Sequence, residues 1–263
     1  MSDRLAAAFA ESNGKRAALM PYLMGGFPDI DASRAAVAAA ADNGADIVEL
    51  GVPFSDPLAD GPVIHAAATE ALRRGTKLDD VLRVCESVAD RLPVVLMVYA
   101  NPILARGVDR FVELAAAAGA AGMIVPDLPH DEAGELRAAA DAGGLALVPL
   151  AAPTSTDQRL TDVGRDGRGF IYTVSLAGTT GERDELPPEL AQTIDRVRAH
   201  TELPVAVGFG ISTPDQAAAV GALADGVIVG SRVVRAAGEG GPEAVGALVA
   251  ELARALGRAD DRG

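Results

Sequence analysis

Short apolar runs alternate with amphipathic, alanine-rich stretches along nearly the whole chain. Each run is four to seven residues long, the usual length of a strand that is buried on both faces. We therefore predict eight strands, at residues 18–24, 46–50, 94–99, 122–126, 146–150, 170–174, 205–208 and 226–230. Because helical stretches separate these strands, we predict that the strands are parallel and covered by helices.

The stretches between the runs carry the signals that start and stop helices. Several open on Asp, Ser or Thr, whose side chains cap a helix N-terminus, and close on Gly, which is favoured just after the C-terminus. Helices are predicted at residues 31–44, 109–119, 131–144 and 214–223, with a short N-terminal helix at 3–12 and a short extra helix after the segment 229–233.

The eight strand–helix units follow one another without a linker or a low-complexity tract. We predict an α/β protein with one domain over residues 1–263, a single (β/α)8 TIM barrel, because such barrels often run to about 250 residues. The alternative is an open, doubly wound sheet, since the order of the strands is not visible in the sequence.

Charge and composition exclude several classes of partner. The formal net charge is −14, and no basic face is apparent, so we expect no nucleic-acid partner. No stretch has the roughly 18 uninterrupted apolar residues of a membrane span, and the N-terminus does not resemble a signal peptide. The only cysteine, Cys85, lies in a helix-forming stretch and is predicted to be a small buried side chain. We therefore expect a cytoplasmic protein that does not bind membranes.

The segment 49–64 stands where a TIM barrel carries its chemistry, after the carboxyl end of a strand. It runs from the strand 46–50 into a loop rich in Pro, Gly and Asp. Glu49 has the apolar neighbours Ile47 and Leu50, so loss of hydration is predicted to raise its pKa toward neutrality. An isolated glutamate in a strand more often pairs with a backbone N–H or an arginine, but the position at a barrel strand end favours an acid–base role.

Other residues of the acidic loop and the two lysines are weaker candidates for chemistry. Asp56 and Asp60 lie in the same loop, where Asp is common because its side chain stabilises turns. Lys15 and Lys77 do not follow predicted strands, which argues against an aldolase that works through a lysine imine.

The three histidines offer no metal site. His65, His130 and His200 fall in or beside different predicted helices, without the spacing of metal ligands. Among them, His65 is the candidate for a functional role because it follows the acidic loop.

Glycine-rich segments follow the last three predicted strands, at residues 176–181, 207–212 and 229–233. Backbone N–H groups of such segments, together with a helix N-terminus, form the phosphate site of many TIM barrels without a lysine or an arginine. The Gly208 to Gly210 pair alone is weak evidence, but Gly230 and Ser231 follow the neighbouring strand and strengthen it. We predict a small phosphoester ligand at this end.

Six motifs, taken together and in order, resemble the tryptophan synthase α chain family. They are ELGVPFSDPLADGPVI (49–64), MPYLMGGFPD (20–29), MVYANP (97–102), VPDLP (125–129), AGTTG (177–181) and GFGIS (208–212). The first motif is long and specific, whereas the glycine-rich ones occur in many phosphate-binding barrels. The resemblance spans nearly the whole chain.

The resemblance implies a lyase that cleaves indole-3-glycerol phosphate into indole and D-glyceraldehyde 3-phosphate. Glu49 would be the acid–base residue, and Asp60 would hold the indole nitrogen and stabilise its developing positive charge. An indolenine that is protonated on the ring serves as the electron sink, so neither an imine nor a metal is needed.

The resemblance also implies the substrate-binding residues. The indole and propyl pocket would be lined by Tyr22, Met97, Tyr99, Ile124, Tyr172 and Ile211. The substrate phosphate would lie near Gly181, Phe209, Gly210, Ile211, Gly230 and Ser231, with Thr180 in a loop that closes over the substrate. For Met97 and Ile124, an ordinary place in the barrel core is also a reasonable interpretation.

The family acts with a pyridoxal-phosphate β chain in an α2β2 assembly, and the α chain itself binds no cofactor. The resemblance implies contacts to that partner from residues 53–58 and 127–130. Leu176 stands where many relatives have an arginine, which puts the signalling of loop closure to the partner in question. Tyr22 stands for a phenylalanine, and His65 for an amide-type residue.

Three other functions are compatible with parts of this pattern. The first is a standalone indole-3-glycerol-phosphate lyase without a partner. The second is a phosphate-binding barrel isomerase, which would normally carry its acid–base residues at other strand ends. The third is a barrel that only activates its partner, an interpretation that the presence of both Glu49 and Asp60 disfavours.

Overall fold

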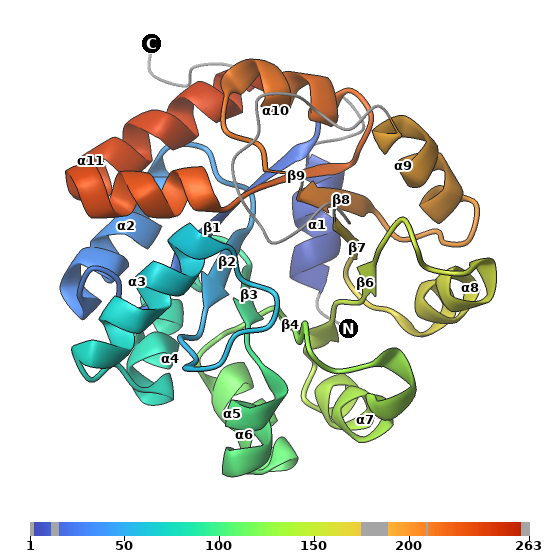
Figure 1. Cartoon of the computed structure of the whole chain (residues 1–263), viewed down its shortest axis with the longest axis horizontal. Coiled ribbons are helices and arrows are strands. Elements are labelled where there is room, and N and C mark those ends of the chain that lie inside the picture. The colour runs from blue at the N-terminus through green and yellow to red at the C-terminus, as the bar shows by residue number, and fades with distance from the viewer. Residues whose placement is uncertain (1–2, 12–15, 175–188, 209, 259–263) are drawn as a thin grey trace.

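The computed structural model describes residues 3–11, 16–174, 189–208 and 210–258, and it shows parallel strands surrounded by helices (Figure 1). The hydrogen-bonded order of the strands is β5-β4-β3-β2-β1-β9-β8-β7-β6, and every pair is parallel. The strands are β1 Ala18–Met24, β2 Val48–Gly51, β3 Val94–Met97, β4 Gly122–Ile124, β5 Ala146–Leu147, β6 Leu150–Ala151, β7 Ile171–Val174, β8 Val205–Gly208 and β9 Gly226–Val229.

The sheet closes into a barrel through the short link between β5 and β6. These two strands end the hydrogen-bonded order, yet only Val148 and Pro149 separate them. The Val148 N–H donates to the carbonyl of Met123 at 2.9 Å, and the Pro149 carbonyl accepts from the Tyr172 N–H at 3.0 Å. One extended segment therefore bonds to β4 on one side and to β7 on the other. The predicted strand 146–150 is confirmed with a break at Pro149, which has no N–H to donate, and the open-sheet alternative is wrong.

Helices cover the outside of the barrel and one of its ends. They are α1 Asp3–Glu11, α2 Ile30–Asp42, α3 Pro62–Arg73, α4 Leu78–Glu86, α5 Ala100–Arg106, α6 Val108–Ala117, the 3-10 turn η1 His130–Glu132, α7 Gly134–Ala142, α8 Asp157–Asp166, α9 Leu190–Arg198, α10 Pro214–Gly221 and α11 Ser231–Ala255. None of these described helices is long and apolar enough to cross a membrane.

Helix ends follow the capping residues in the sequence. The Asp29 carboxylate accepts from the Ala32 N–H at 2.8 Å and starts α2, and Thr213 and Gln216 form a capping box at α10. The predicted helix 131–144 is divided into η1 and α7. The short helix expected after residue 233 is longer than predicted, because α11 continues past a break at Gly241, where φ is +62°.

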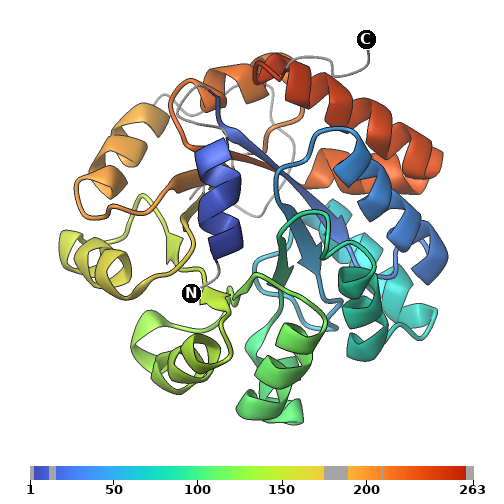
Figure 2. The ribbon, with the colours of Figure 1, turned by 180° about the vertical axis from the view of Figure 1, so that it is seen from behind.

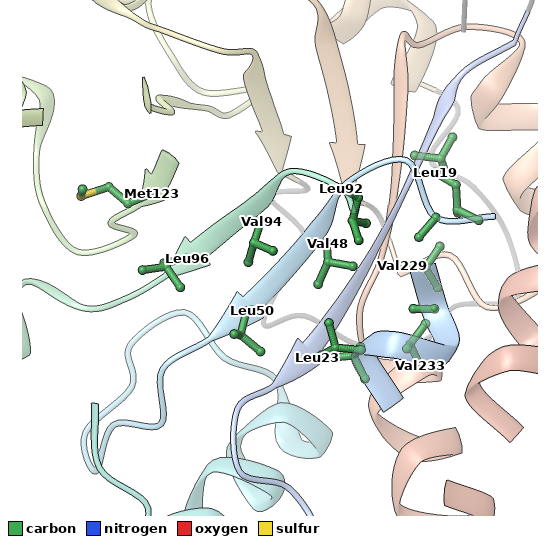
Figure 3. Packing of buried hydrophobic residues seen from close by; sticks show 14 of the residues in the cluster. Leu19, Leu23, Val48, Leu50, Leu92, Val94, Leu96, Met123, Val229 and Val233 are labelled. Carbon is green, nitrogen blue, oxygen red and sulfur yellow. The ribbon is translucent and has the colours of Figure 1, made fainter. Parts of the chain in front are cut away.

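Alternation along the strands creates two apolar layers. One cluster lies between strands and helices and includes Leu19, Val48 and Leu96 (Figure 3). The other fills the barrel interior with Met20, Ile47, Val95, Ile124, Tyr172 and Ile228. Successive side chains point to opposite faces of a strand, so each strand contributes to both layers.

Helix α1 closes the end of the barrel where the strands begin. Its buried residues Leu5, Ala8 and Phe9 belong to the interior cluster, and the rings of Phe9 and Phe170 lie 5.6 Å apart. Figure 2 shows this helix lying across the barrel. A ligand can therefore enter the interior only from the opposite end, where the strands lead into their loops.

The cysteine lies as predicted, buried in α4. Its Sγ donates to the carbonyl of Ala118 at 3.4 Å, and burial raises the pKa of the thiol to about 12. Cys85 is thus a protonated packing residue rather than a nucleophile.

Leu5→Ala is expected to lower the free energy of unfolding by about 2–5 kcal/mol, because it removes a fully buried side chain from the closed end. Chemical denaturation measures this loss. The matched change Ala7→Ser on the exposed side of the same helix should stay within about 0.5 kcal/mol. Equal effects of the two changes would show that α1 does not close the barrel.

Candidate active site

Glu49 lies inside the barrel at the mouth end of β2. Tyr22 of β1 and Val95 of β3 are its neighbours in register. The residue is 0% exposed, and neither carboxyl oxygen has a hydrogen-bond partner among the described residues. Burial raises the pKa of Glu49 to about 8, as its apolar neighbours led us to expect. A carboxyl with a pKa near neutrality can both donate and accept a proton at physiological pH.

Asp60 lies on the loop between β2 and α3 and is held by Tyr99. The Tyr99 hydroxyl donates to the Asp60 carboxylate at 2.9 Å and accepts from the Ala59 N–H at 3.2 Å. The ring of Tyr99 stacks on Phe54 with centroids 5.2 Å apart. Burial raises the pKa of Asp60, although the hydrogen bond from Tyr99 and the charge of His65 act in the opposite direction. Asp60 is therefore fixed near the mouth.

Asp56 differs from Asp60, although both belong to the same loop. It is exposed, and its carboxylate accepts from the neighbouring Ser55 hydroxyl at 2.5 Å. This is the geometry of a turn residue.

Two further tyrosines point into the mouth, and each lies over a glycine. A Cβ placed on Gly51 would be 2.0 Å from the Tyr22 hydroxyl, and one on Gly208 would be 2.6 Å from the Tyr172 hydroxyl. Burial and the charge of Glu49 raise the pKa of both phenols, and Asp60 also raises that of Tyr22. Both hydroxyls therefore keep their protons and can donate hydrogen bonds.

The remaining predicted pocket residues divide between pocket and core. Met97 is half-buried and packs against both the interior cluster and the cluster around Tyr22. Ile124 is fully buried in the interior cluster with Tyr172. Ile211 is buried and belongs to the outer cluster between strands and helices.

The glycines after β8 and β9 come together because the two strands are neighbours. Gly210 has φ +65°, a conformation that favours glycine. Gly230 is the N-cap of α11 and Ser231 is its first residue. Thr180, Gly181, Phe209 and Leu176 lie outside the described residues.

A match to a known family agrees with this geometry. The family model for the tryptophan synthase alpha chain matches residues 9–257. The tryptophan synthase alpha chain of Synechococcus elongatus is 48% identical over 92% of each chain, and that of Geobacter sulfurreducens is 46% identical over 97% of this chain and 99% of the relative. A chain in a solved structure of Mycobacterium tuberculosis tryptophan synthase superposes with a TM-score of 0.92 at 42% identity, covering 97% of this chain and 99% of that one.

The chain belongs to the tryptophan synthase alpha chain family. It is a lyase of tryptophan biosynthesis with a TIM-barrel fold, as the six sequence motifs indicated. Within this family fold, Glu49, Asp60 and three tyrosines share the open end of the barrel, while the histidines are dispersed.

The histidines lie in three different surroundings. His65 is exposed on α3, close enough to Asp60 to lower its pKa. The Nε2 of His130 lies 3.2 Å from the Oδ2 of Asp166, and the Nδ1 of His200 lies 2.9 Å from the Oγ1 of Thr161. No group of three His, Cys, Asp or Glu side chains within the described part of the chain is placed to hold a metal ion.

Two features of this barrel were not predicted from the sequence. One is the fit of Tyr22 and Tyr172 over Gly51 and Gly208. The other is a cavity of about 360 Å³ beside the barrel, lined by residues 125–130 and by parts of α7, β5, β6 and α8. Gly51 and Gly208 stand at or just after the ends of apolar runs in the sequence. Which tyrosine packs against each glycine depends on the register of the strands.

Glu49→Gln is expected to stabilise the folded protein above about pH 5. The folded protein holds the Glu49 proton up to about pH 8, whereas the unfolded chain releases it near 4.5, so the wild type loses stability as pH rises between these values. The difference in the free energy of unfolding between the variant and the wild type should grow from pH 5 to pH 8 and then remain constant. Urea unfolding at pH 5, 6.5 and 8 measures it.

The control for this experiment is Glu135→Gln, which changes an exposed glutamate. Its effect on the free energy of unfolding should stay within about 0.5 kcal/mol. If the stability difference between Glu49→Gln and the wild type does not vary with pH, the pKa of Glu49 is not raised.

Proposed function

We propose that the chain cleaves indole-3-glycerol phosphate into indole and D-glyceraldehyde 3-phosphate, with Glu49 as acid and base and Asp60 as the stabilising anion. The observation that carries this proposal is the buried, unpartnered Glu49 carboxyl, whose pKa is raised to about 8. A second carboxylate, Asp60, is fixed at the same mouth by Tyr99.

The cleavage can be written with these two groups alone. Protonated Glu49 gives its proton to the indole carbon that carries the glycerol chain, and the positive charge that develops on the ring nitrogen is stabilised by Asp60. Glu49, now a carboxylate, takes the proton of the hydroxyl on the adjacent glycerol carbon. The bond between that carbon and the ring breaks, its electrons return to the ring, and an aldehyde forms. Glu49 ends protonated, as it began.

The burial of the site suits this chemistry. In a medium of low polarity, the attraction between a carboxylate and a developing cation is stronger than in water. The proton transfers need no metal and no organic group, and we propose that the chain uses no cofactor of its own.

We assign the indole and propyl portions to the pocket of Tyr22, Met97, Tyr99, Ile124 and Tyr172. The substrate phosphate would contact backbone N–H groups around Gly210, Ile211, Gly230 and Ser231, at the N-terminus of α11, where the helix dipole favours an anion. Thr180, Gly181 and Phe209 complete the proposed substrate-binding set.

We further propose that the chain acts with a tryptophan synthase β chain in an α2β2 assembly, which carries pyridoxal phosphate in the β chain and works in the cytoplasm. Leu58 and Leu104, at 81% and 64%, are the two most exposed large hydrophobic side chains among the described residues. Both follow strands at the open end, on the β2–α3 loop and on α5. A partner that covers this end would receive indole as it leaves the site, which favours the paired enzyme over a standalone lyase.

Glu49→Gln is expected to lower kcat for indole release by at least about a hundredfold, because glutamine keeps the shape but cannot transfer the proton. Substrate affinity, measured by calorimetry on the inactive variant, should change little. Asp56→Asn, in the same loop, is the control and should retain turnover. Near-normal kcat in Glu49→Gln would contradict the mechanism.

Leu58→Ser is expected to weaken the complex with a β chain about tenfold or more, because it removes an apolar contact from the proposed interface. Titration of the α chain into the β chain gives the Kd. The control is Leu223→Ser, which changes a leucine that is 38% exposed just before β9, at the closed end. If both changes weaken binding equally, or neither does, the partner does not bind over Leu58.

A further inference from the structure

The side chain of Tyr22 crosses from β1 onto β2. Its backbone is the register partner of Glu49, but its hydroxyl and ring edge lie where the Cβ of residue 51 would be, at 2.0 and 2.6 Å from that position. Gly51 follows Glu49 by two residues on the same face of β2 and therefore lies roughly 6.6 Å nearer the mouth. The Tyr22 phenol thus covers the mouth side of Glu49, and only a glycine at position 51 leaves room for it.

The hydroxyl of Tyr22 has no hydrogen-bond partner among the described residues, unlike that of Tyr99, which donates to Asp60 and accepts from the Ala59 N–H. The Glu49 carboxyl oxygens also have none within the described part of the chain. A buried carboxylate without a donor is strongly disfavoured. An extended glutamate side chain is long enough to span most of the interval to Gly51, and the charge of Glu49 already acts on Tyr22.

We propose that Tyr22 is a positioning residue for Glu49, whose hydroxyl donates a hydrogen bond to the Glu49 carboxylate whenever that group is ionised. The hydrogen bond stabilises the base form during the cycle and directs the carboxylate toward the mouth. This inference rests on the proposed acid–base role of Glu49.

The other titratable groups around this pair do not replace Tyr22 as donor. Asp60 comes from the β2–α3 loop and is an acceptor. Tyr99 follows β3 and is already bonded to Asp60. The Tyr172 hydroxyl lies against Gly208 on β8, whereas the Tyr22 hydroxyl lies against Gly51 on the strand of Glu49. On β2 and β3, the interior neighbours Ile47 and Val95 are apolar. Burial and the charges of Asp60 and Glu49 raise the pKa of Tyr22, so its hydroxyl stays protonated while Glu49 titrates.

The test compares Tyr22→Phe with the wild type by infrared titration of the Glu49 carboxyl in the ligand-free protein. The Glu49 signal is identified by its absence in Glu49→Gln. Phenylalanine keeps the ring and removes only the hydroxyl, so the carboxylate loses its donor and the Glu49 midpoint should rise by about one pH unit. The limb of the kcat/KM profile that Glu49 controls should move upward by the same amount.

Two further variants sharpen the test. Thr173→Val removes another buried hydroxyl, on the outer face of β7, and should leave the Glu49 midpoint unchanged. Gly51→Ala places a methyl group where the Tyr22 hydroxyl lies and should raise the midpoint as Tyr22→Phe does. Adding Tyr22→Phe to Gly51→Ala should then give no further rise, because the two changes break the same interaction.

The outcomes separate this inference from the proposed function. A raised midpoint in Tyr22→Phe supports the hydrogen bond even if the protein has no lyase activity. An unchanged midpoint overturns the inference, and if the kcat/KM limb nevertheless moves, Tyr22 contacts the substrate rather than Glu49.

Discussion

The interior of a closed barrel accepts only every second side chain of each strand, and this constraint decides which residues can be structural and which can be chemical. At the closed end, the interior positions are filled by apolar residues such as Met20 and Ile47 and by the buried face of α1. At the open end, the next interior position on β2 is Glu49. Its lack of solvent, and hence its raised pKa, follows from the same alternation that packs the core.

The cost of this arrangement falls on stability. A fully buried carboxyl without a partner is one of the least favourable groups that a core can contain, and a hydrocarbon or an amide would suit the fold better. Active sites often retain such groups because the reaction needs them. Here the Glu49 carboxyl has no hydrogen-bond partner among the described residues, and the donor proposed above, Tyr22, would act only when the group is ionised.

Much of the fold could be predicted from the sequence, because the periodicity of apolar residues reports burial directly. The strand positions, the use of Asp and Thr as helix caps, and the burial of Cys85 and Glu49 all follow from local patterns. The strand–helix repeat favoured a closed barrel, but periodicity alone left the open sheet possible, since closure depends on bonds from Val148 and Pro149 to two different strands. The same limit applies to the site: Tyr99 and Asp60 are 39 residues apart in the sequence, and the fit of Tyr22 over Gly51 depends on strand register.

The pairing of β1 with β9 joins the first and last strands of the chain and has a consequence for synthesis on the ribosome. Until residues 226–229 emerge, β1 has a free edge whose backbone groups can pair with any other extended chain. Nearly the whole polypeptide must therefore be translated before the ring of hydrogen bonds is complete, and incomplete chains are the form of this protein most prone to aggregate.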